Sequence, residues 1–400
     1  MFKVAKVFFM YTVLAMLVFS CKKKSTTVEL AAPDNYFVSA TSAGTVSKAD
    51  MQMRAGFAGF GTSVNSLINY DSEFIRIIYK TKYKGRVIEV SGLLGLPKNG
   101  PFNPSIISAQ HETRFLSSSA PSLFPNASTG YEILAGMGYI VVIPDYIGFG
   151  ASSIEVRPYF LREYAGLAVV DMIKAAKEYL KNQKISSSGR LFLLGYSEGG
   201  YATLAAQREI ELNPSHQLTV TASAAGGGGF DLKTMVSEIS SKPTYAGAAY
   251  LALMLNSYNL VYDWKRPLNS FFNEPYASNI LSLLDGTKDS QTISSALTND
   301  LSILLNPVFL ADLKTEGKES ILKDSFVQNS FFDWYPKGLT RLYHGTADEI
   351  VPYKSTQTTF DAFKAAGATN LTLRPLNGNH FNSATLMMAD VLPWLISTDK

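Results

Sequence analysis

A serine between two glycines is the residue of this chain best suited to covalent chemistry. The apolar run 191–194 is typical of a buried strand, Gly195-Tyr196-Ser197-Glu198-Gly199 follows it, and residues 201–212 have a helix-like composition. A serine at a sharp turn from strand to helix exposes its hydroxyl, and small glycines beside it allow the backbone to make that turn. The N-terminus of the helix provides free N–H groups close to where an oxyanion would form. The pattern therefore predicts a nucleophile at Ser197 rather than a chance glycine-serine turn.

A serine hydroxyl needs a base to remove its proton and a carboxylate to hold that base in the right tautomer. The chain has four histidines, so the search is short. His380 lies in a turn between the last predicted strand and the last predicted helix, and Asp348 lies in the loop after the preceding strand. Along the chain the three candidate residues follow in the order Ser197, Asp348, His380. Two other serine-protease folds carry a serine, an acid and a histidine in different chain orders. We expect His380 to be the base and Asp348, rather than its neighbour Glu349, to be the acid.

The other three histidines are expected to have structural roles. His344 ends a predicted strand, where we expect it to pack and form hydrogen bonds, and His216 is expected in an exposed loop. His111 follows a predicted strand and is expected to support the loop that it begins. The sequence has no cluster of histidine, cysteine and carboxylate residues with the spacing of a metal site, so we expect no metal and no other cofactor.

The elements that must hold these residues alternate between strands and helices. Runs 74–83 and 86–96 are joined by Lys84-Gly85, which predicts an antiparallel hairpin. Helix-like segments such as 161–180 and 355–366 separate most of the later strands. This alternation predicts an α/β fold with a mostly parallel sheet covered by helices on both faces. The further predicted strands are 104–110, 139–143, 190–194, 218–222, 339–343 and 371–374.

Residues 231–335 interrupt the alternation, since they are mostly helix-like and contain no strong strand. We interpret them as a helical cap inserted between two parts of an α/β core, residues 46–230 and 336–400. Gly226–Gly229 lacks the spacing of a phosphate-binding loop, and we expect it to allow close packing near the rim of the site. Six aromatic residues either line an apolar acyl site or form the core of the cap itself: Phe271, Phe272, Phe309, Phe331, Phe332 and Trp334.

The N-terminus predicts export. Lys3 and Lys6 precede the short apolar run 7–19, as in a signal peptide over residues 1–20. Leu17-Val18-Phe19-Ser20-Cys21 resembles a bacterial lipobox, with Phe19 an imperfect fit, and this resemblance implies cleavage before Cys21 and lipidation of its thiol. The protein would then be a membrane-anchored lipoprotein of the cell envelope, with residues 21–45 as the linker between its lipid anchor and its fold. The alternative is a secreted protein with an incidental cysteine.

The amino-acid composition indicates the class of protein and the kinds of partner that it can bind. An apolar content of 46% with 17% charged residues describes a globular chain with a sizeable core. The formal net charge of +3 gives no argument for binding nucleic acid. A single cysteine excludes disulfides within the chain, and the oligomeric state stays open.

Three motifs in this order resemble the α/β-hydrolase superfamily, and most closely its secretory lipases and related bacterial esterases. They are Gly195-Tyr196-Ser197 with Gly199-Gly200, Pro144-Asp145-Tyr146 through Gly150, and His344-Gly345 with Asp348 and Val351-Pro352. The resemblance covers residues 70–397. It implies the nucleophile at Ser197, the acid at Asp348 and the base at His380, and the hydrolysis of carboxylic esters with the insertion as a lid over an acyl pocket.

The oxyanion would be held by two backbone N–H groups. One belongs to Glu198, the residue after the nucleophile, and the other comes from the loop after the third core strand. Many members of the superfamily carry His-Gly in that loop, whereas this chain has His111-Glu112. The second donor is therefore open among Glu112, Thr113 and their neighbours.

These observations favour an esterase or lipase that forms an acyl-enzyme on its serine. Its substrate would be a small-molecule, lipid or sugar ester, and a lipid anchor at Cys21 would bind it to a membrane. Two alternatives stay open, namely a serine peptidase of the same superfamily and a non-catalytic binding lipoprotein that keeps the fold.

Overall fold

The computed structural model describes residues 33, 35–57 and 62–400. Of these, Pro33–Lys400 belongs to one compact unit. The predicted signal peptide, Cys21 and the first part of the predicted linker lie outside the described residues. None of the helices in the described ranges has both the length and the apolar character needed to cross a membrane.

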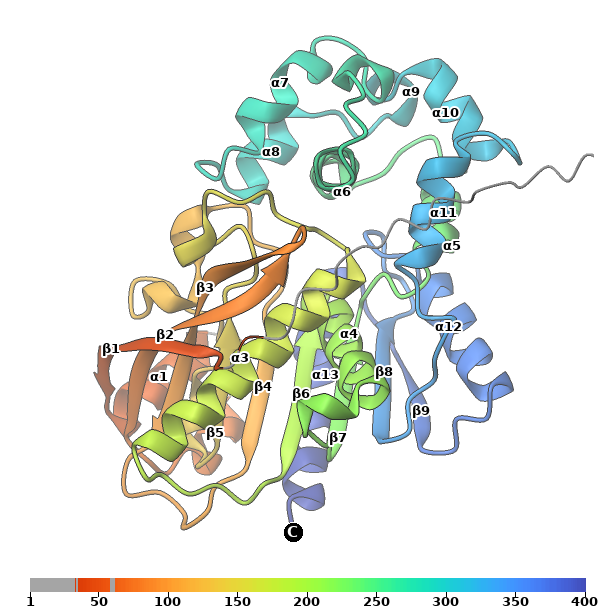
Figure 1. The fold of residues 1–400 in the computed structure, drawn as a ribbon. Helices are drawn as coiled ribbons and strands as arrows, with labels where there is room; N and C mark the ends of the chain where they lie inside the picture. Colours follow the sequence, from red (N-terminus) through yellow and green to blue (C-terminus); the bar gives the residue numbers. More distant parts are fainter. Residues whose placement is uncertain (1–32, 34, 58–61) are drawn as a thin grey trace, which may run out of the picture. The chain divides into compact units, whose positions relative to one another are not determined.

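A nine-stranded sheet forms the centre of the fold, in the order β1-β2-β3-β5-β4-β6-β7-β8-β9 (Figure 1). Pairing is antiparallel from β1 to β3 and between β3 and β5, and it is parallel across the six remaining strands. The mostly parallel sheet is therefore confirmed. The strands are β1 (Phe37–Val46), β2 (Ser72–Tyr83), β3 (Arg86–Pro97), β4 (Ile106–Gln110), β5 (Ile140–Pro144), β6 (Leu191–Tyr196), β7 (Ala222–Gly226), β8 (Leu339–Gly345) and β9 (Leu371–Leu376).

The predicted hairpin is confirmed as β2 and β3. Lys84 and Gly85 connect the strands and have φ values of 46° and 72°. Two consecutive positive φ angles are typical of the two-residue turns that match the twist of a hairpin. Tyr83 pairs with Arg86 directly beside this turn, so the turn sets the register of the whole hairpin.

Helices cover both faces of the sheet, as predicted. Side chains alternate along β6, so that Leu193 faces one apolar cluster and Phe192 and Leu194 face another. All six residues of β6 are buried, as expected for a central parallel strand. The first face is covered by α3 (Arg162–Asn182), α4 (Glu198–Leu212) and α12 (Tyr353–Ala365), and the second by α1 (Lys48–Phe57), α2 (Ile133–Gly136) and α13 (His380–Thr398).

The predicted strand 218–222 is wrong in its position, because β7 begins where that prediction ends. The strand has the sequence Ala-Ser-Ala-Ala-Gly, which lacks the β-branched residues that usually indicate a strand. Close packing explains these small residues. A Cβ atom on Gly200 of α4 would collide with the carbonyl of Gly226, and one on Gly226 would collide with Met387.

The predicted linker 21–45 is also wrong for its last residues, because Phe37–Val46 forms the edge strand β1. Most of its side chains are exposed, so no alternation of apolar residues indicated a strand. Backbone pairing with β2 holds it instead, and the carboxylate of Glu178 accepts hydrogen bonds from the N–H groups of Tyr36 and Phe37.

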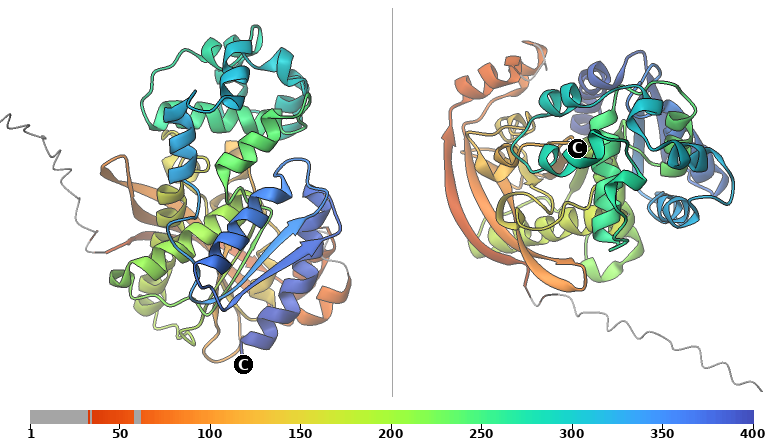
Figure 2. Two further views of the ribbon diagram at one scale, coloured as in Figure 1. Left: turned by 90° about the vertical axis from the view of Figure 1, so that its right-hand side faces the viewer. Right: turned by 90° about the horizontal axis from the view of Figure 1, so that it is seen from above.

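The segment 231–335 lies between β7 and β8 and contains seven α-helices. Figures 1 and 2 show α6 to α10 beyond the carboxyl end of the parallel strands. We call this segment the helical insertion. Its helices are α5 (Leu232–Ser240), α6 (Ala248–Val261), α7 (Tyr276–Leu283), α8 (Ser290–Ala296), α9 (Leu301–Leu304), α10 (Pro307–Lys314) and α11 (Ser320–Gln328).

Candidate active site

Ser197 lies at the tight turn between β6 and α4. Its backbone angles, φ 58° and ψ −123°, fall in a region that costs a non-glycine residue about 1–3 kcal/mol. Gly195 and Gly199 make this turn sterically possible. A Cβ atom on Gly195 would collide with the carbonyl of Gly199, and one on Gly199 would collide with the carbonyl of Gln110. The glycines of the motif are therefore required by the approach of neighbouring backbone.

His380 is the first residue of α13, and its imidazole lies between Ser197 and Asp348. Nε2 is 3.0 Å from Oγ of Ser197, and Nδ1 is 2.7 Å from Oδ2 of Asp348. With Nδ1–H donating to the carboxylate, Nε2 is free to accept the serine proton. The hydroxyl of Tyr196 donates to the carbonyl of His380 at 2.8 Å and fixes the start of the helix. The structure thus brings together three residues that are distant in the sequence.

Asp348 is buried and fully hydrogen bonded. Its Oδ1 accepts from the N–H groups of Ile350 at 2.9 Å and Val351 at 2.8 Å. Burial raises its pKa, but hydrogen bonds from His344 and His380 outweigh burial and bring the pKa to about 2. The carboxyl is therefore ionised at neutral pH.

Glu349, the rival of Asp348, is oriented differently. Its Oε2 accepts from the backbone N–H of His380 at 3.3 Å, whereas the imidazole ring is hydrogen bonded to Asp348. The geometry therefore favours Asp348 as the partner of the histidine.

His344 is buried at the end of β8. Its Nδ1 is 2.6 Å from the hydroxyl of Thr356, and its Nε2 is 2.7 Å from the carbonyl of Val351. Packing and hydrogen bonding at this position agree with the prediction. The sequence analysis missed the 3.2 Å approach of Nε2 to Oδ2 of Asp348. The spacing of four residues in His-Gly-Thr-Ala-Asp was the available signal.

The residues predicted to hold the oxyanion lie close to Ser197. Glu198 is the first residue of α4, so its N–H has no acceptor within the helix. Its buried side chain forms an ion pair with Arg157. Burial raises the pKa of this carboxyl, although Arg157 opposes that effect. Glu112 and Thr113 line the same cavity as Ser197, and neither is distinguished as the second donor.

His111 supports the loop after β4, as expected. Its ring lies 4.2 Å from that of Tyr146, and its Nδ1 is 2.7 Å from the carbonyl of Glu112. Burial, assisted by the charge of Arg114, lowers its pKa to about 3, so the ring is neutral. By contrast, the prediction of an exposed His216 is wrong. The short turn Pro214–His216 folds it against α4, where Nε2 is 2.7 Å from a carboxylate oxygen of Glu209.

Two cavities reach Ser197. The larger has a volume of about 200 Å³ and is also lined by His380, Tyr131 and Phe381. The smaller has a volume of about 20 Å³ and lies beneath α5 and α6. The six aromatic residues for which an acyl site and a cap core were alternatives line neither cavity. Five of them are buried in the apolar cluster that includes the insertion, and Phe332 is 46% exposed. They belong to the core around the insertion rather than to the site.

Comparisons with known proteins agree on one family. The model of the secretory lipase family matches residues 131–398. A trichothecene C-3 esterase of Fusarium sporotrichioides is 23% identical over 68% of this chain and 59% of its own length. A secreted triacylglycerol lipase of Malassezia furfur is 24% identical over 77% of this chain and 66% of its own length. The chain thus spans less than two thirds of these relatives.

A solved structure shows the same fold. A variant of the rice cell wall degrading esterase LipA from Xanthomonas oryzae superimposes with a TM-score of 0.80 at 21% identity. The superposition covers 92% of this chain and 100% of that chain. The predicted α/β-hydrolase fold is therefore confirmed.

Proposed function

This chain belongs to the secretory lipase family, and we propose on that premise that it hydrolyses carboxylic esters with Ser197, His380 and Asp348 as a catalytic triad. One observation carries the proposal. His380 lies within hydrogen-bond distance of both the serine hydroxyl, at 3.0 Å, and the buried carboxylate, at 2.7 Å. This is the geometry by which a base activates a serine while a carboxylate orients the base.

In the acylation step, Oγ of Ser197 attacks the ester carbonyl and His380 Nε2 takes the hydroxyl proton. The tetrahedral intermediate then collapses, and the bond between the carbonyl carbon and the alcohol oxygen breaks. His380 returns its proton to the leaving alcohol, which leaves an acyl group on Ser197. Asp348 stays ionised and stabilises the imidazolium throughout, which agrees with its low pKa.

In the deacylation step, water replaces the alcohol. The water oxygen attacks the acyl carbonyl while His380 takes a proton from the water. His380 then gives that proton to Oγ of Ser197. The carboxylic acid leaves and the free enzyme is restored. We assign the N–H of Glu198 as one donor to the oxyanion of both steps, with the second donor in the segment Glu112–Thr113.

The division of the chain belongs to the same proposal. Residues 46–230 and 336–400 form the catalytic core, and the helical insertion acts as a cap that decides which esters reach Ser197. Processing before Cys21 and lipidation of its thiol would anchor the enzyme in the cell envelope. Secretion without an anchor is the alternative, and the family description agrees with it.

The proposal is tested with Ser197→Ala, assayed on p-nitrophenyl acetate beside the matched variant Ser215→Ala. Ser215 is exposed and lies in the turn Pro214–His216, away from the site. We expect Ser197→Ala to lose at least about 10³-fold in kcat, while Ser215→Ala keeps the wild-type rate. Equal activity of both variants would contradict the proposal. Faster turnover of an aminoacyl amide than of any ester would instead indicate a peptidase.

A further inference from the structure

The two cavities at Ser197 differ in chemistry and meet at only two of their lining residues, Ser197 and Tyr250. An ester bound at Ser197 has two parts, the acyl chain and the alcohol. Each cavity can therefore hold one of them, and the position of His380 decides which.

His380 lines the larger cavity and is absent from the lining of the smaller one. The base must return its proton to the leaving alcohol, so the alcohol has to lie on the side of the imidazole. The larger cavity also presents the hydroxyl-bearing side chains of Thr113, Thr129 and Tyr131. The hydroxyls of Thr113 and Thr129 have partners in Tyr159 and Glu132, so it is the volume of about 200 Å³ that suits a bulky alcohol.

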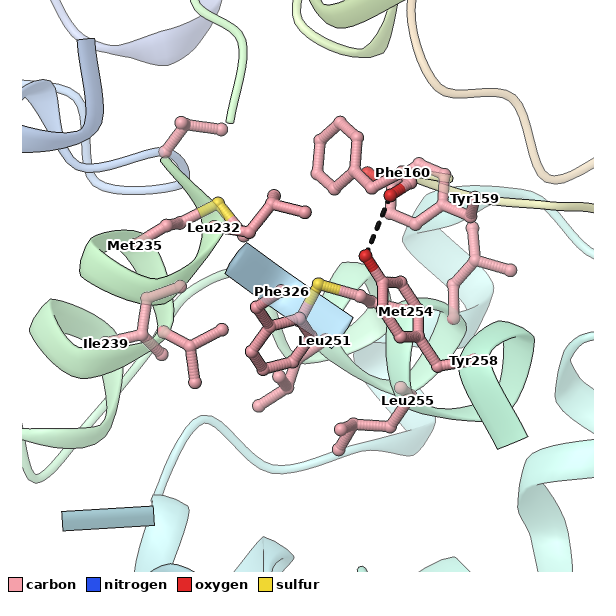
Figure 3. Close-up of a cluster of buried hydrophobic side chains, with 14 of the residues drawn as sticks. Tyr159, Phe160, Leu232, Met235, Ile239, Leu251, Met254, Leu255, Tyr258 and Phe326 are labelled. Atoms are coloured by element: carbon pink, nitrogen blue, oxygen red, sulfur yellow. Dashed lines mark hydrogen bonds between the residues drawn. The ribbon is translucent and has the colours of Figure 1, made fainter. Parts of the chain in front are cut away.

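The smaller cavity is left for the acyl chain, and its walls are apolar. Met235 and Ile239 of α5 face Leu251 and Met254 of α6 across it, with Phe160 nearby (Figure 3). Two of the three tyrosine hydroxyls in the lining are hydrogen bonded to protein groups. That of Tyr245 donates to the carbonyl of Ile350 at 2.8 Å, and that of Tyr159 lies 3.1 Å from the hydroxyl of Thr113. An apolar group therefore fits this cavity better than a polar one.

The volume of the smaller cavity limits the length of the acyl chain. A single water needs about 10–15 Å³ on this measure, and the cavity offers about 20 Å³. It therefore has room for about one to two carbons beyond the ester carbonyl. The surrounding side chains are packed against a second layer, in which the hydroxyl of Tyr258 donates to the carbonyl of Phe160 at 2.8 Å (Figure 3).

We propose that this protein is a short-acyl esterase, which holds an acyl group of about two to three carbons in the smaller cavity and a bulky alcohol in the larger one. The inference rests on the proposed function, since it needs Ser197 to be the acylated residue. Met254 and Ile239 set the acyl limit, because they wall the narrow space from opposite helices.

The test is a series of p-nitrophenyl esters from acetate to octanoate, measured on the wild type, Met254→Ala and Met172→Ala. Met172 is a fully buried methionine of α3 that lines neither cavity, so it controls for the loss of a core side chain. We expect the wild type to favour acetate or propanoate over octanoate by about tenfold or more in kcat/KM. Met254→Ala should raise the octanoate-to-acetate ratio by about tenfold, and Met172→Ala should leave it unchanged. Should Met254→Ala fail to fold, Ile239→Ala makes the same test.

The alcohol side is tested with Thr385→Trp, which places a bulky ring in the lining of the larger cavity. It should lower kcat/KM for p-nitrophenyl acetate relative to vinyl acetate, whose alcohol part is small, and leave the acyl-length preference intact. A wild type that prefers octanoate overturns the short-acyl inference and leaves ester hydrolysis standing. A wild type that hydrolyses no ester of the series contradicts the proposed function itself.

Discussion

The imidazole of His344 lies 3.2 Å from Oδ2 of Asp348, the carboxylate oxygen that also faces His380. Nε2–H of His344 also faces the carbonyl of Val351 at 2.7 Å, so its one proton is shared between that carbonyl and Oδ2. The N–H groups of Ile350 and Val351 hold Oδ1. The carboxylate of Asp348 can form all of these hydrogen bonds in only one orientation. In that orientation Oδ2 faces His380.

Replacement of His344 should therefore disturb catalysis through Asp348. In His344→Phe the carboxylate loses a donor that it shares with the carbonyl of Val351, so its pKa rises toward the ordinary value and its orientation is less fixed. We expect kcat to fall by about 10- to 100-fold and the acid limb of the pH–rate profile to move, with partial recovery in His344→Gln. His216→Phe removes another buried histidine, and both kcat and the pH–rate profile should remain those of the wild type. A His344→Phe enzyme with an unchanged pH profile would show that the contact is only structural.

The two neighbouring carboxylates should differ sharply in their effect on activity. Asp348→Asn leaves His380 without its ionised partner, and kcat should fall by about 10³-fold or more. Glu349→Gln still offers an acceptor to the backbone N–H of His380, so kcat should change by less than about tenfold. Steady-state kinetics on one ester decide the assignment, and the reverse order of effects would make Glu349 the acid.

A buried carboxyl outside the site predicts a pH dependence of stability. Burial raises the pKa of Asp171 to about 7, against the hydrogen bond from Thr81 and the charge of Lys174. The folded state therefore binds this proton more tightly than the unfolded state. Stability is greatest below the unfolded pKa near 4 and declines as pH rises toward about 7.

Asp171→Asn should remove this decline, because its amide is neutral and its oxygen still accepts from Thr81. Between pH 4 and pH 8 the variant should gain up to about 4 kcal/mol in free energy of unfolding relative to the wild type. Urea denaturation at several pH values measures this difference. The idea fails if the difference between the two proteins is the same at pH 4 and pH 8.

Membrane anchoring depends on a residue outside the described part of the chain. If Cys21 is lipidated, the wild type should sediment with membranes and incorporate a labelled fatty acid, and Cys21→Ser should do neither. A wild type found entirely in the culture medium without label would support plain secretion.

The sequence predicts most of the parallel core because its strands are apolar runs bounded by turns. The pairing of Ser197, Asp348 and His380 was likewise predictable, since each lies at the carboxyl end of a predicted strand or the turn after it, and those ends share one edge of the sheet. By contrast, β1 was not apparent, because backbone pairing and not an apolar face holds it.

The cavities could not be predicted. The smaller one is lined from five separate stretches of chain, near Tyr159, Ser197, Met235, Met254 and Ile350, and only the tertiary fold brings them together. The aromatic residues of the insertion, which the sequence offered as candidates for an acyl site, belong to the core around the insertion.

Mapping a covalent adduct on the protein identifies the residue that is acylated during turnover, which we expect to be Ser197. The folded wild type is treated with a fluorophosphonate, digested, and analysed by mass spectrometry. We predict one modified peptide with the adduct on Ser197, and no labelling of Ser197→Ala. An adduct on another residue, or an unlabelled protein that still hydrolyses esters, would contradict the account.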